Sequence, residues 1–407
     1  MERAAKSWSE PAAVAGSDAE RRAALALAAR LREGGREVAV ETVWVRPRWE
    51  LTHALHAGLG VVASLIAVAS PIAGLALALV ALLSLLLDLS GRLFLLRRLT
   101  PERATQNVIA SASARADHAV PGDGDGGASG AGAGGATPPL RVILTAHCDV
   151  PRGGLLRRLA RGRGGGARTA GRRGAPNRPG APLPGPFAWI VLALLGVAVC
   201  AVLRIADVDG SGIGAIQLVP TLVLLVALGL LLDAALSRAP TPAAETDGAM
   251  APAAAEPGPS APEIVLAAAQ ALDATVLRRV SVEVVIAGAG TGQALGFLAY
   301  LRRRRPSPER NVVIEIAEGA AVTVPTWWTR DGALLPLRYH PRLVALAAAA
   351  AADEPQLAAR DRRGHAIGAA LRARQRRIPA IRLAAPHAAD ALALTLALVE
   401  LLDEEGG

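Results

Sequence analysis

Two long apolar stretches dominate the pattern of hydrophobic and polar positions along the chain. The first covers residues 51–87 and is interrupted at Ser70-Pro71. The second consists of residues 187–203 and 216–232, separated by a polar loop at 204–214. A helix needs about 20 apolar residues to cross a bilayer, with about 17 as the lower limit, so each stretch predicts a hairpin of two spans. A buried core hairpin is an alternative that suits one stretch better than both.

The arginines near the ends of these stretches predict how the chain is oriented. Most of them flank one side, and the opposite side offers the Ser70-Pro71 turn and a loop with Arg204. Arginine and lysine are enriched in cytoplasmic loops. We therefore expect a multi-pass protein of the cell membrane with about four spans, and with both termini and the soluble domain in the cytoplasm. The arginines on the favoured side are Arg46, Arg48, Arg92, Arg97, Arg98, Arg172, Arg173, Arg178 and Arg238.

Outside the hairpins, strands alternate with helices. Ser17-Asp18-Ala19-Glu20 is a capping-box pattern that opens a helix, and Gly34-Gly35 ends it. Residues 38–45 alternate in polarity as a strand does. The same reasoning predicts strands at 107–110, 140–146, 280–287, 311–317 and 378–383. It predicts helices at 263–272, 343–352 and 389–402, and a turn followed by a helix at 288–305. This alternation predicts an α/β sandwich that the two hairpins interrupt.

The predicted organisation follows from these elements. The soluble domain is expected to begin with a helix and a strand and to resume after each hairpin. The predicted segments are 1–50 (first helix and strand), 51–90 (first transmembrane hairpin), 91–150 (core with a His-x-Asp strand), 151–186 (basic Arg/Gly/Pro-rich loop), 187–236 (second transmembrane hairpin), 237–262 (Pro/Ala linker) and 263–407 (the rest of the domain).

The amino-acid composition limits the kinds of binding partner that we expect. The formal net charge is +9, but Lys6 is the only lysine, and such an arginine bias reflects a GC-rich coding sequence most simply. The basic loop at 151–186 has no aromatic residue to stack on single-stranded nucleic acid, so no specific nucleic-acid partner is expected and membrane lipids are. With Cys148 and Cys200 as the only cysteines, a disulfide scaffold is excluded.

Candidate chemistry lies at the end of the strand at 140–146, which runs into His147-Cys148-Asp149. Loops at the carboxyl ends of the strands in an α/β sheet build binding crevices. An imidazole there can ligate zinc while a nearby carboxylate orients its ring. Cys148 is either a soft ligand or a core residue. The pattern predicts a metal site only if further ligands come from elsewhere in the chain.

Several segments, taken in order, resemble metallopeptidase family 28, the zinc aminopeptidases of clan MH. The resemblance covers most of the chain outside the hairpins and low-complexity tracts. It implies a three-layer α/β sandwich with a mixed sheet, a site with two zinc ions, and a glutamate base. The segments that carry it are AGSDAERRAALALAARLREGGREVAVET, TQNVIA, LRVILTAHCDV, VEVVIAGAGTGQALGFLAYL, NVVIEIAEG, and IPAIRL followed by PHAAD.

Residue by residue, the resemblance keeps only part of the family's site. It implies that His147 and His387 are metal ligands and that Asp149 is the orienting carboxylate. The family's two catalytic glutamates fall on Gly290 and Thr291, neither of which can act as a base.

The other carboxylate ligands have uncertain counterparts. Glu256 lies nearest to the expected bridging aspartate, and Glu318 or Glu315 replaces the remaining one. Zinc binding is therefore not assured. Trp327, Trp328 and Arg330 follow the last core strand and either line the cleft for a substrate or partner or form an ordinary packed loop.

These residues favour a catalytically degenerate pseudopeptidase on the membrane that binds a peptide, a lipid or a protein partner. An active zinc-dependent aminopeptidase with a rearranged site and a membrane scaffold are the alternatives. Three further features have simpler interpretations. His53 and His56 are expected to anchor a span at the interface, His340 and His365 to lie on the surface, and residues 302–305 to form a solvated helix end or a phospholipid contact.

Overall fold

A nine-stranded mixed sheet forms the centre of the part of the chain outside the four long apolar helices. The computed structural model describes residues 13–112, 140–155, 186–206, 210–237, 260–319, 322–334 and 336–405. The strand order is β1-β2-β4-β3-β5-β9-β6-β7, with β8 paired to β6. The strands are β1 (Glu37–Val45), β2 (Arg103–Ser111), β3 (Leu140–His147), β4 (Val280–Ala287), β5 (Asn311–Ile316), β6 (Thr326–Asp331), β7 (Leu337–Arg338), β8 (Arg360–Arg363) and β9 (Ala380–Ala384).

The centre of the sheet is parallel, and its edges are antiparallel. Strands β4, β3, β5 and β9 run parallel to one another, whereas β1, β2 and β6 join through antiparallel pairs. The central strands are buried on both faces, and they are accordingly rich in valine and isoleucine. Because their carboxyl ends lie at one edge, the residues that follow them are brought together.

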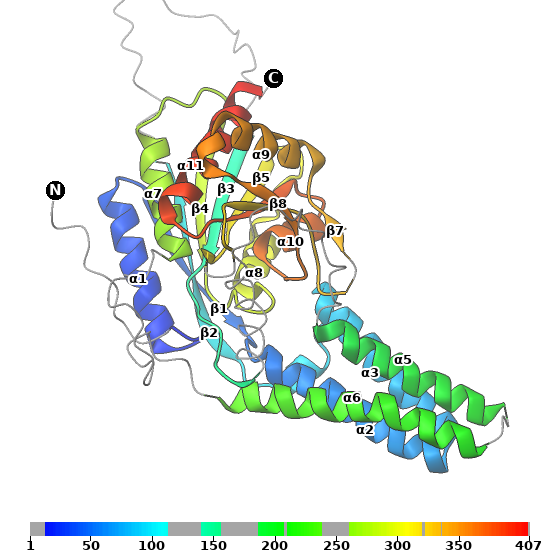
Figure 1. Cartoon of the computed structure of the whole chain (residues 1–407). Helices are drawn as coiled ribbons and strands as arrows, with labels where there is room; N and C mark the ends of the chain where they lie inside the picture. Colours follow the sequence, from blue (N-terminus) through cyan, green and yellow to red (C-terminus); the bar gives the residue numbers. More distant parts are fainter. Residues whose placement is uncertain are drawn as a thin grey trace, which may run out of the picture.

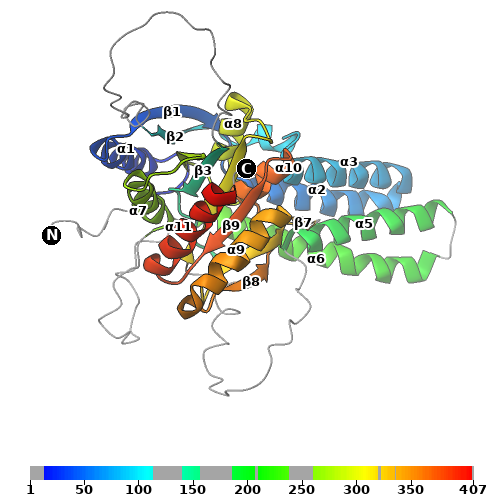
Figure 2. The ribbon, with the colours of Figure 1, turned by 90° about the horizontal axis from the view of Figure 1, so that it is seen from above.

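Helices cover both faces of the sheet, so the expected three-layer α/β fold class is confirmed. One face packs against α1 (Asp18–Glu33), α7 (Ala261–Asp273), α9 (Pro341–Asp353) and α11 (Ala388–Glu405). The opposite face packs against α8 (Leu295–Arg304) and α10 (Ala369–Gln375). Figure 2 shows α7, α11 and α9 side by side over the first face. Short 3-10 turns η1 (Leu96–Leu99) and η5 (Pro355–Leu357) complete the described elements.

The four predicted spans form a helical bundle. They are α2 (Trp49–Ala69), α3 (Pro71–Ser90), α5 (Pro186–Ile205) and α6 (Gly210–Leu236), and each is long and apolar enough to cross a membrane. Helix α2 packs against α3 and α6, and α5 packs against α3 and α6. The bundle projects away from the sheet (Figure 1). The interruption at Ser70-Pro71 is a tight connection, because Pro71 begins α3 at a position where its missing N–H costs nothing.

The short elements β6, β7, β8 and α10 (Ala369–Gln375) have no counterpart among the elements that the sequence pattern predicts. Trp327, Trp328 and Arg330 do not form a loop: they belong to β6, which pairs with β8 and β9. Short strands of this kind exist through their long-range pairing rather than through a local pattern. The low-complexity tract at 121–139 and most of the loop at 151–186 and of the linker at 237–262 lie outside the described residues, and so does Glu256.

Candidate functional site

A row of side chains crosses the carboxyl ends of the parallel strands β4, β3, β5 and β9. Thr145 and His147 lie on β3, and Ala287, Glu315 and Arg382 lie on the other strands. The register places Thr145 beside Glu315, and Glu315 beside Arg382. Alternate residues of a strand point to opposite faces, and all five residues share the face that α8 and α10 cover. This row forms the floor of the candidate site.

A cavity of about 310 Å³ lies above this floor. Its walls come from the turn at 290–294, from the loop at 365–369, and from Glu318. Trp49 and Phe187, at the first turns of α2 and α5, close the side next to the bundle, where their rings contact each other in an edge-on arrangement with centroids 5.9 Å apart. Pockets for small ligands begin at about 300 Å³, so the cavity can hold a small molecule or the end of a larger one.

His147 and Asp149 interact directly at the end of β3. The ring Nδ1 of His147 lies 2.9 Å from the carbonyl oxygen of Asp149 and 3.5 Å from its carboxylate Oδ1. Because a carbonyl oxygen only accepts, Nδ1 carries the proton and donates it. Burial lowers the pKa of His147, but the hydrogen bond and charge of Asp149, with the charges of Glu318 and Glu315, outweigh burial and raise that pKa to about 9. The ring is therefore an imidazolium at neutral pH.

The carboxylate of Asp149 accepts hydrogen bonds from the backbone of Gly290 and Thr291, the two positions where the resemblance implies glutamates. The backbone N–H of Gly290 donates to Oδ1 at 2.5 Å, and that of Thr291 donates to Oδ2 at 2.9 Å. Burial raises the pKa of Asp149, but its bonds to His147 and Thr291 prevail and hold that pKa below its usual range. A Cβ atom at position 290 would lie 2.1 Å from the Cβ of His147. The backbone here leaves no room for a glutamate side chain.

A second buried carboxylate binds the same turn. Glu20 Oε1 accepts from the backbone N–H of Ala289 at 2.8 Å and from the Thr105 hydroxyl at 2.7 Å, and Oε2 accepts from the N–H of Gly16 at 2.6 Å. Burial, together with the charge of Asp149, raises the pKa of Glu20 to about 7. The sequence around Glu20 predicts only its part in a capping box. Its long-range role had no local signal, because its partners are distant in sequence.

The predicted metal ligands do not assemble. His387 is exposed just before α11, and the cavity walls do not include it. Glu318 lies at the cavity but is exposed, and Glu315 is buried and accepts a hydrogen bond from the N–H of Ala370 at 2.9 Å. Among the residues that the structure describes, no three His, Cys, Asp or Glu side chains are placed to hold a metal ion.

The donor set therefore does not fit a zinc ion of the aminopeptidase kind. The Nδ1 of His147 donates to Asp149, which leaves its Nε2 available for a metal ion. No two further ligands, however, lie near that ring among the described residues. Both oxygens of Asp149 accept backbone N–H groups. Burial raises the pKa of the Cys148 thiol well above its usual range, so Cys148 is not a thiolate at neutral pH.

The predicted cleft residues lie beside the cavity rather than in its wall. Trp327 and Trp328 are buried on opposite faces of β6. The Arg382 guanidinium, which does line the cavity, lies 4.8 Å from the centre of the Trp328 ring and donates to Asp331 Oδ2 at 2.9 Å. Burial lowers the pKa of Arg382, but Glu315 and Asp331 raise it above its ordinary value. Trp328 thus supports a cavity residue.

His365 was expected on the surface, but it is half-buried and lines the cavity. No pattern around it marks this position. The loop that carries it follows β8, and only the pairing of β8 with β6 brings the loop to the site. His340 is half-buried as well, at the position that caps α9.

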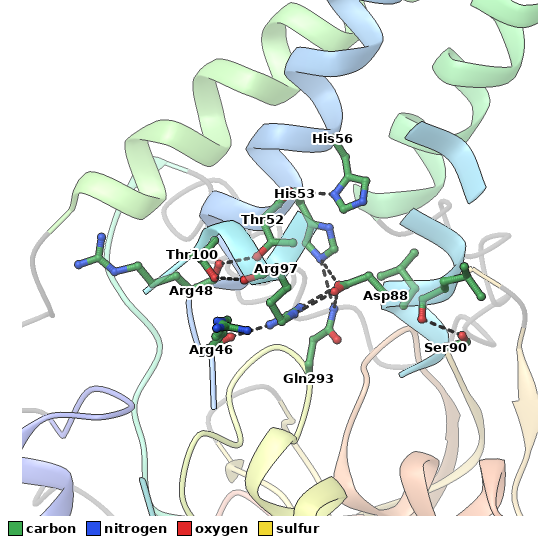
Figure 3. A network of polar contacts seen from close by, with 12 residues as sticks. Arg46, Arg48, Thr52, His53, His56, Asp88, Ser90, Arg97, Thr100 and Gln293 are labelled. Carbon is green, nitrogen blue, oxygen red and sulfur yellow. Dashed lines mark hydrogen bonds and ion pairs between the residues drawn. The ribbon is translucent and has the colours of Figure 1, made fainter. Parts of the chain in front are cut away.

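A buried polar junction ties the cavity turn to the first hairpin (Figure 3). The Gln293 side-chain amide donates to Asp88 Oδ2 at 2.9 Å, and Arg97 donates to both oxygens of Asp88 at 2.9 and 2.8 Å. Arg372 donates to the Gln293 side chain and to its backbone carbonyl, each at 3.1 Å. Asp88, Arg97, Gln293 and Arg372 are all buried. The soluble domain and the bundle therefore share one polar core.

His53 and His56 belong to this junction, so the expectation of interfacial anchors is wrong. Both side chains are fully buried between the helices. His53 Nε2 lies 3.7 Å from Asp88 Oδ2, and His56 Nε2 lies 3.0 Å from the Ser84 hydroxyl. Helical spacing places the two rings on one face, as the sequence suggested, but that face packs against α3.

Comparisons with known proteins give structural neighbours only. No protein-family model matches the chain, and no curated protein is similar to it in sequence. The solved structures similar to it include the glutaminyl cyclase of Porphyromonas gingivalis, with 12% identity over 96% of this chain and 92% of that chain and a TM-score of 0.41. They also include the zinc aminopeptidase BSAP of Bacillus subtilis, with 10% identity over 96% and 90% and a TM-score of 0.42. The LapA aminopeptidase of Legionella pneumophila has 8% identity over 97% and 68% and a TM-score of 0.38.

Proposed function

We propose that this protein is a membrane-anchored pseudopeptidase whose soluble domain binds a ligand in the cavity at the carboxyl edge of the sheet without cleaving it. The observation that carries the proposal is the turn at Gly290-Thr291. Its backbone N–H groups bind Asp149, and a side chain at position 290 would collide with the His147 side chain. By the sequence resemblance to metallopeptidase family 28, this turn is the place where the catalytic glutamates would lie.

Loss of chemistry follows from what hydrolysis needs. A catalytic zinc site requires about three protein ligands and an open position for water. A general base must also lie within hydrogen-bond reach of that water. In the described part of the chain, His147 and Asp149 bind each other and the turn, and His387 does not reach them. The lack of a three-ligand set among the described residues supports binding rather than catalysis.

The cavity retains the features of a binding site. Trp49, Phe187 and Phe297 offer aromatic surface, while His147 and Glu318 offer opposite charges. A peptide, a lipid or a segment of a partner protein has both apolar and charged groups of this kind. Since Trp49 and Phe187 belong to candidate spans, the ligand would bind next to the membrane, and the arginine distribution favours a cytoplasmic location for this side.

The first test is the zinc content of the detergent-purified full chain, measured by inductively coupled plasma mass spectrometry beside a His147→Ala, His387→Ala double variant. We expect no stoichiometric zinc in either protein and no release of chromogenic amines from aminoacyl substrates with zinc added. Zinc at about one or two ions per wild-type chain and none in the variant, together with zinc-dependent cleavage, would instead establish the rearranged metallohydrolase.

A second test separates binding from a purely structural scaffold. Dipeptides and lysophospholipids are screened for stabilisation of the wild-type chain against heat, and hits are repeated with Ala366→Trp, which fills the cavity. Ala299→Trp, on α8 and outside the cavity walls, is the control substitution. Stabilisation that Ala366→Trp abolishes and the control keeps supports the proposal, whereas no hit, or hits unaffected by Ala366→Trp, favours the scaffold.

A further inference from the structure

Five arginines lie on segments that meet at the end of α3, and we call them the arginine collar: Arg92 and Arg98 follow α3 in the chain, Arg302 and Arg305 end α8, and Arg376 ends α10. Arg302 donates to the carbonyl oxygen of Gly91 at 2.9 Å, directly after the last residue of α3. Its guanidinium lies 5.5 Å from the centre of the Phe94 ring. Arg376 donates to the carbonyl oxygen of Leu301 at 3.3 Å. Segments far apart in the sequence thus bring positive charge to one place.

The collar is not neutralised by acidic side chains. In the part of the chain that the structure describes, none of the five arginines of the collar forms an ion pair. Other arginines of α8 do form such pairs. Burial, with the like charges of Arg302 and Arg305, lowers the pKa of Arg376. Like charges held close together without a counter-charge attract anions.

Large apolar side chains are exposed within the same surface. Leu93, Leu95 and Leu99 follow α3 and are 39%, 41% and 72% exposed. Arg92 and Arg98 lie in the same stretch of the chain, so apolar and cationic groups share one short segment. In water such an arrangement would cost free energy. At a bilayer surface, leucines enter the boundary between headgroups and acyl chains while arginines stay among the headgroups.

The neighbouring residues Arg303 and Arg304 differ from the collar arginines because they form ion pairs. Both lie on the last turn of α8 beside Arg302, and both pair with Glu41, at 3.1 and 2.7 Å. The fold therefore neutralises two arginines of this helix end and leaves Arg302 and Arg305 without an ion pair. A helix end that served solubility alone would not require this difference.

We propose that the arginine collar is a binding surface for anionic phospholipid headgroups of the leaflet in which α3 ends. Charge complementarity selects the phosphate and any further negative charge of the headgroup. The exposed leucines and the end of a candidate span place the surface at the bilayer, which argues for a lipid rather than an acidic protein. The proposal is independent of whether the cavity binds or cleaves a ligand.

The test uses the full chain in nanodiscs that contain equal amounts of phosphatidylglycerol and phosphatidylcholine, followed by native mass spectrometry of the lipids that remain bound. Wild type is compared with Arg302→Gln, Arg305→Gln and with Arg303→Gln, Arg304→Gln, which remove the same charge from the same helix end. We expect wild type to retain phosphatidylglycerol preferentially. Loss of two collar arginines should lower that preference about tenfold or more, and the control pair should keep it within about twofold.

The control is strict, because both double variants remove two positive charges from the same helix end, and Arg303→Gln, Arg304→Gln also leaves Glu41 without its ion pairs. Equal loss in both double variants would overturn the proposal, since it would show a response to net charge alone. Equal retention of the two lipids by wild type would also overturn it and would leave the collar to an acidic protein. Circular dichroism and size-exclusion profiles matching wild type confirm that all the chains compared are folded.

Discussion

Gln293 donates a hydrogen bond of 2.9 Å from its side-chain amide to Asp88, which joins the turn at the candidate site to the first hairpin of the bundle. The same glutamine accepts from Arg372 through its side chain and through its backbone. One residue thus satisfies a buried anion and a buried cation at the boundary between the two parts of the molecule. The position of the cavity turn depends on the bundle as well as on the sheet.

Replacing Gln293 with leucine is expected to destabilise the protein by about 1–3 kcal/mol, because Arg372 and Asp88 each lose a buried hydrogen-bond partner. Thermal and chemical unfolding of the detergent-purified chain, followed by tryptophan fluorescence, measures the change. Gln375→Leu is the matched control, since Gln375 accepts from the same Arg372 at 2.9 Å but is exposed. If the two variants lose equal stability, the junction is not the critical contact.

Asp88→Asn is expected to lower the free energy of unfolding more than Gln293→Leu does, by about 3–5 kcal/mol. The substitution removes the counter-charge of Arg97, which donates to both carboxylate oxygens, and a buried charge left without its partner is strongly unfavourable. Yield and size-exclusion profile in detergent are the measurements. Asp233→Asn, on α6 with an exposed hydrogen bond to Leu155, should behave as wild type, and an equal loss there would point to a general sensitivity of the bundle.

Gly290→Ala tests the close contact beneath the cavity turn. Its Cβ would lie 2.1 Å from that of His147, so the turn must move, and overpacking of this kind costs about 1–3 kcal/mol. Gly229→Ala on α6 meets no atom within 4 Å and should be neutral or slightly stabilising. Putting glutamate at both 290 and 291 should produce an unstable protein without aminopeptidase activity. Recovery of activity would show that the turn can open.

The buried carboxyl group of Glu20 is expected to make the stability of the protein depend on pH. Its pKa is about 7 in the folded protein against an ordinary 4.5, so the folded state binds more protons between these values. The free energy of unfolding should therefore fall as the pH rises from about 4.5 to about 7, by up to about 3 kcal/mol. Glu20→Gln should lose this dependence, and the difference between the two proteins at pH 5 and pH 8 isolates it. Parallel curves would rule out a raised pKa.

Much of the fold could be predicted because its signals are local. The capping box at Ser17, the alternation in 38–45 and the break at Ser70-Pro71 each depend on neighbours in the chain, and the structure confirms the helix, the strand and the hairpin that they predict. Strands β6, β7 and β8 are short and polar at many positions. They are stabilised by pairing with distant strands, which no local pattern reports.

Some features of the candidate site could also be predicted from the sequence, and others depend on the tertiary structure. The sequence by itself determined that His147 and Asp149 end a buried strand, that Gly290 and Thr291 stand where glutamates were expected, and that four helices can span a membrane. Only the tertiary structure decided that backbone N–H groups occupy Asp149, that Glu20 and His365 come to the site while His387 does not, and that His53, Asp88 and Gln293 form one buried junction. The physical reason is that periodicity and capping act between neighbours, whereas burial, shared hydrogen bonds and shifted pKa values arise between residues that folding brings together across the whole chain.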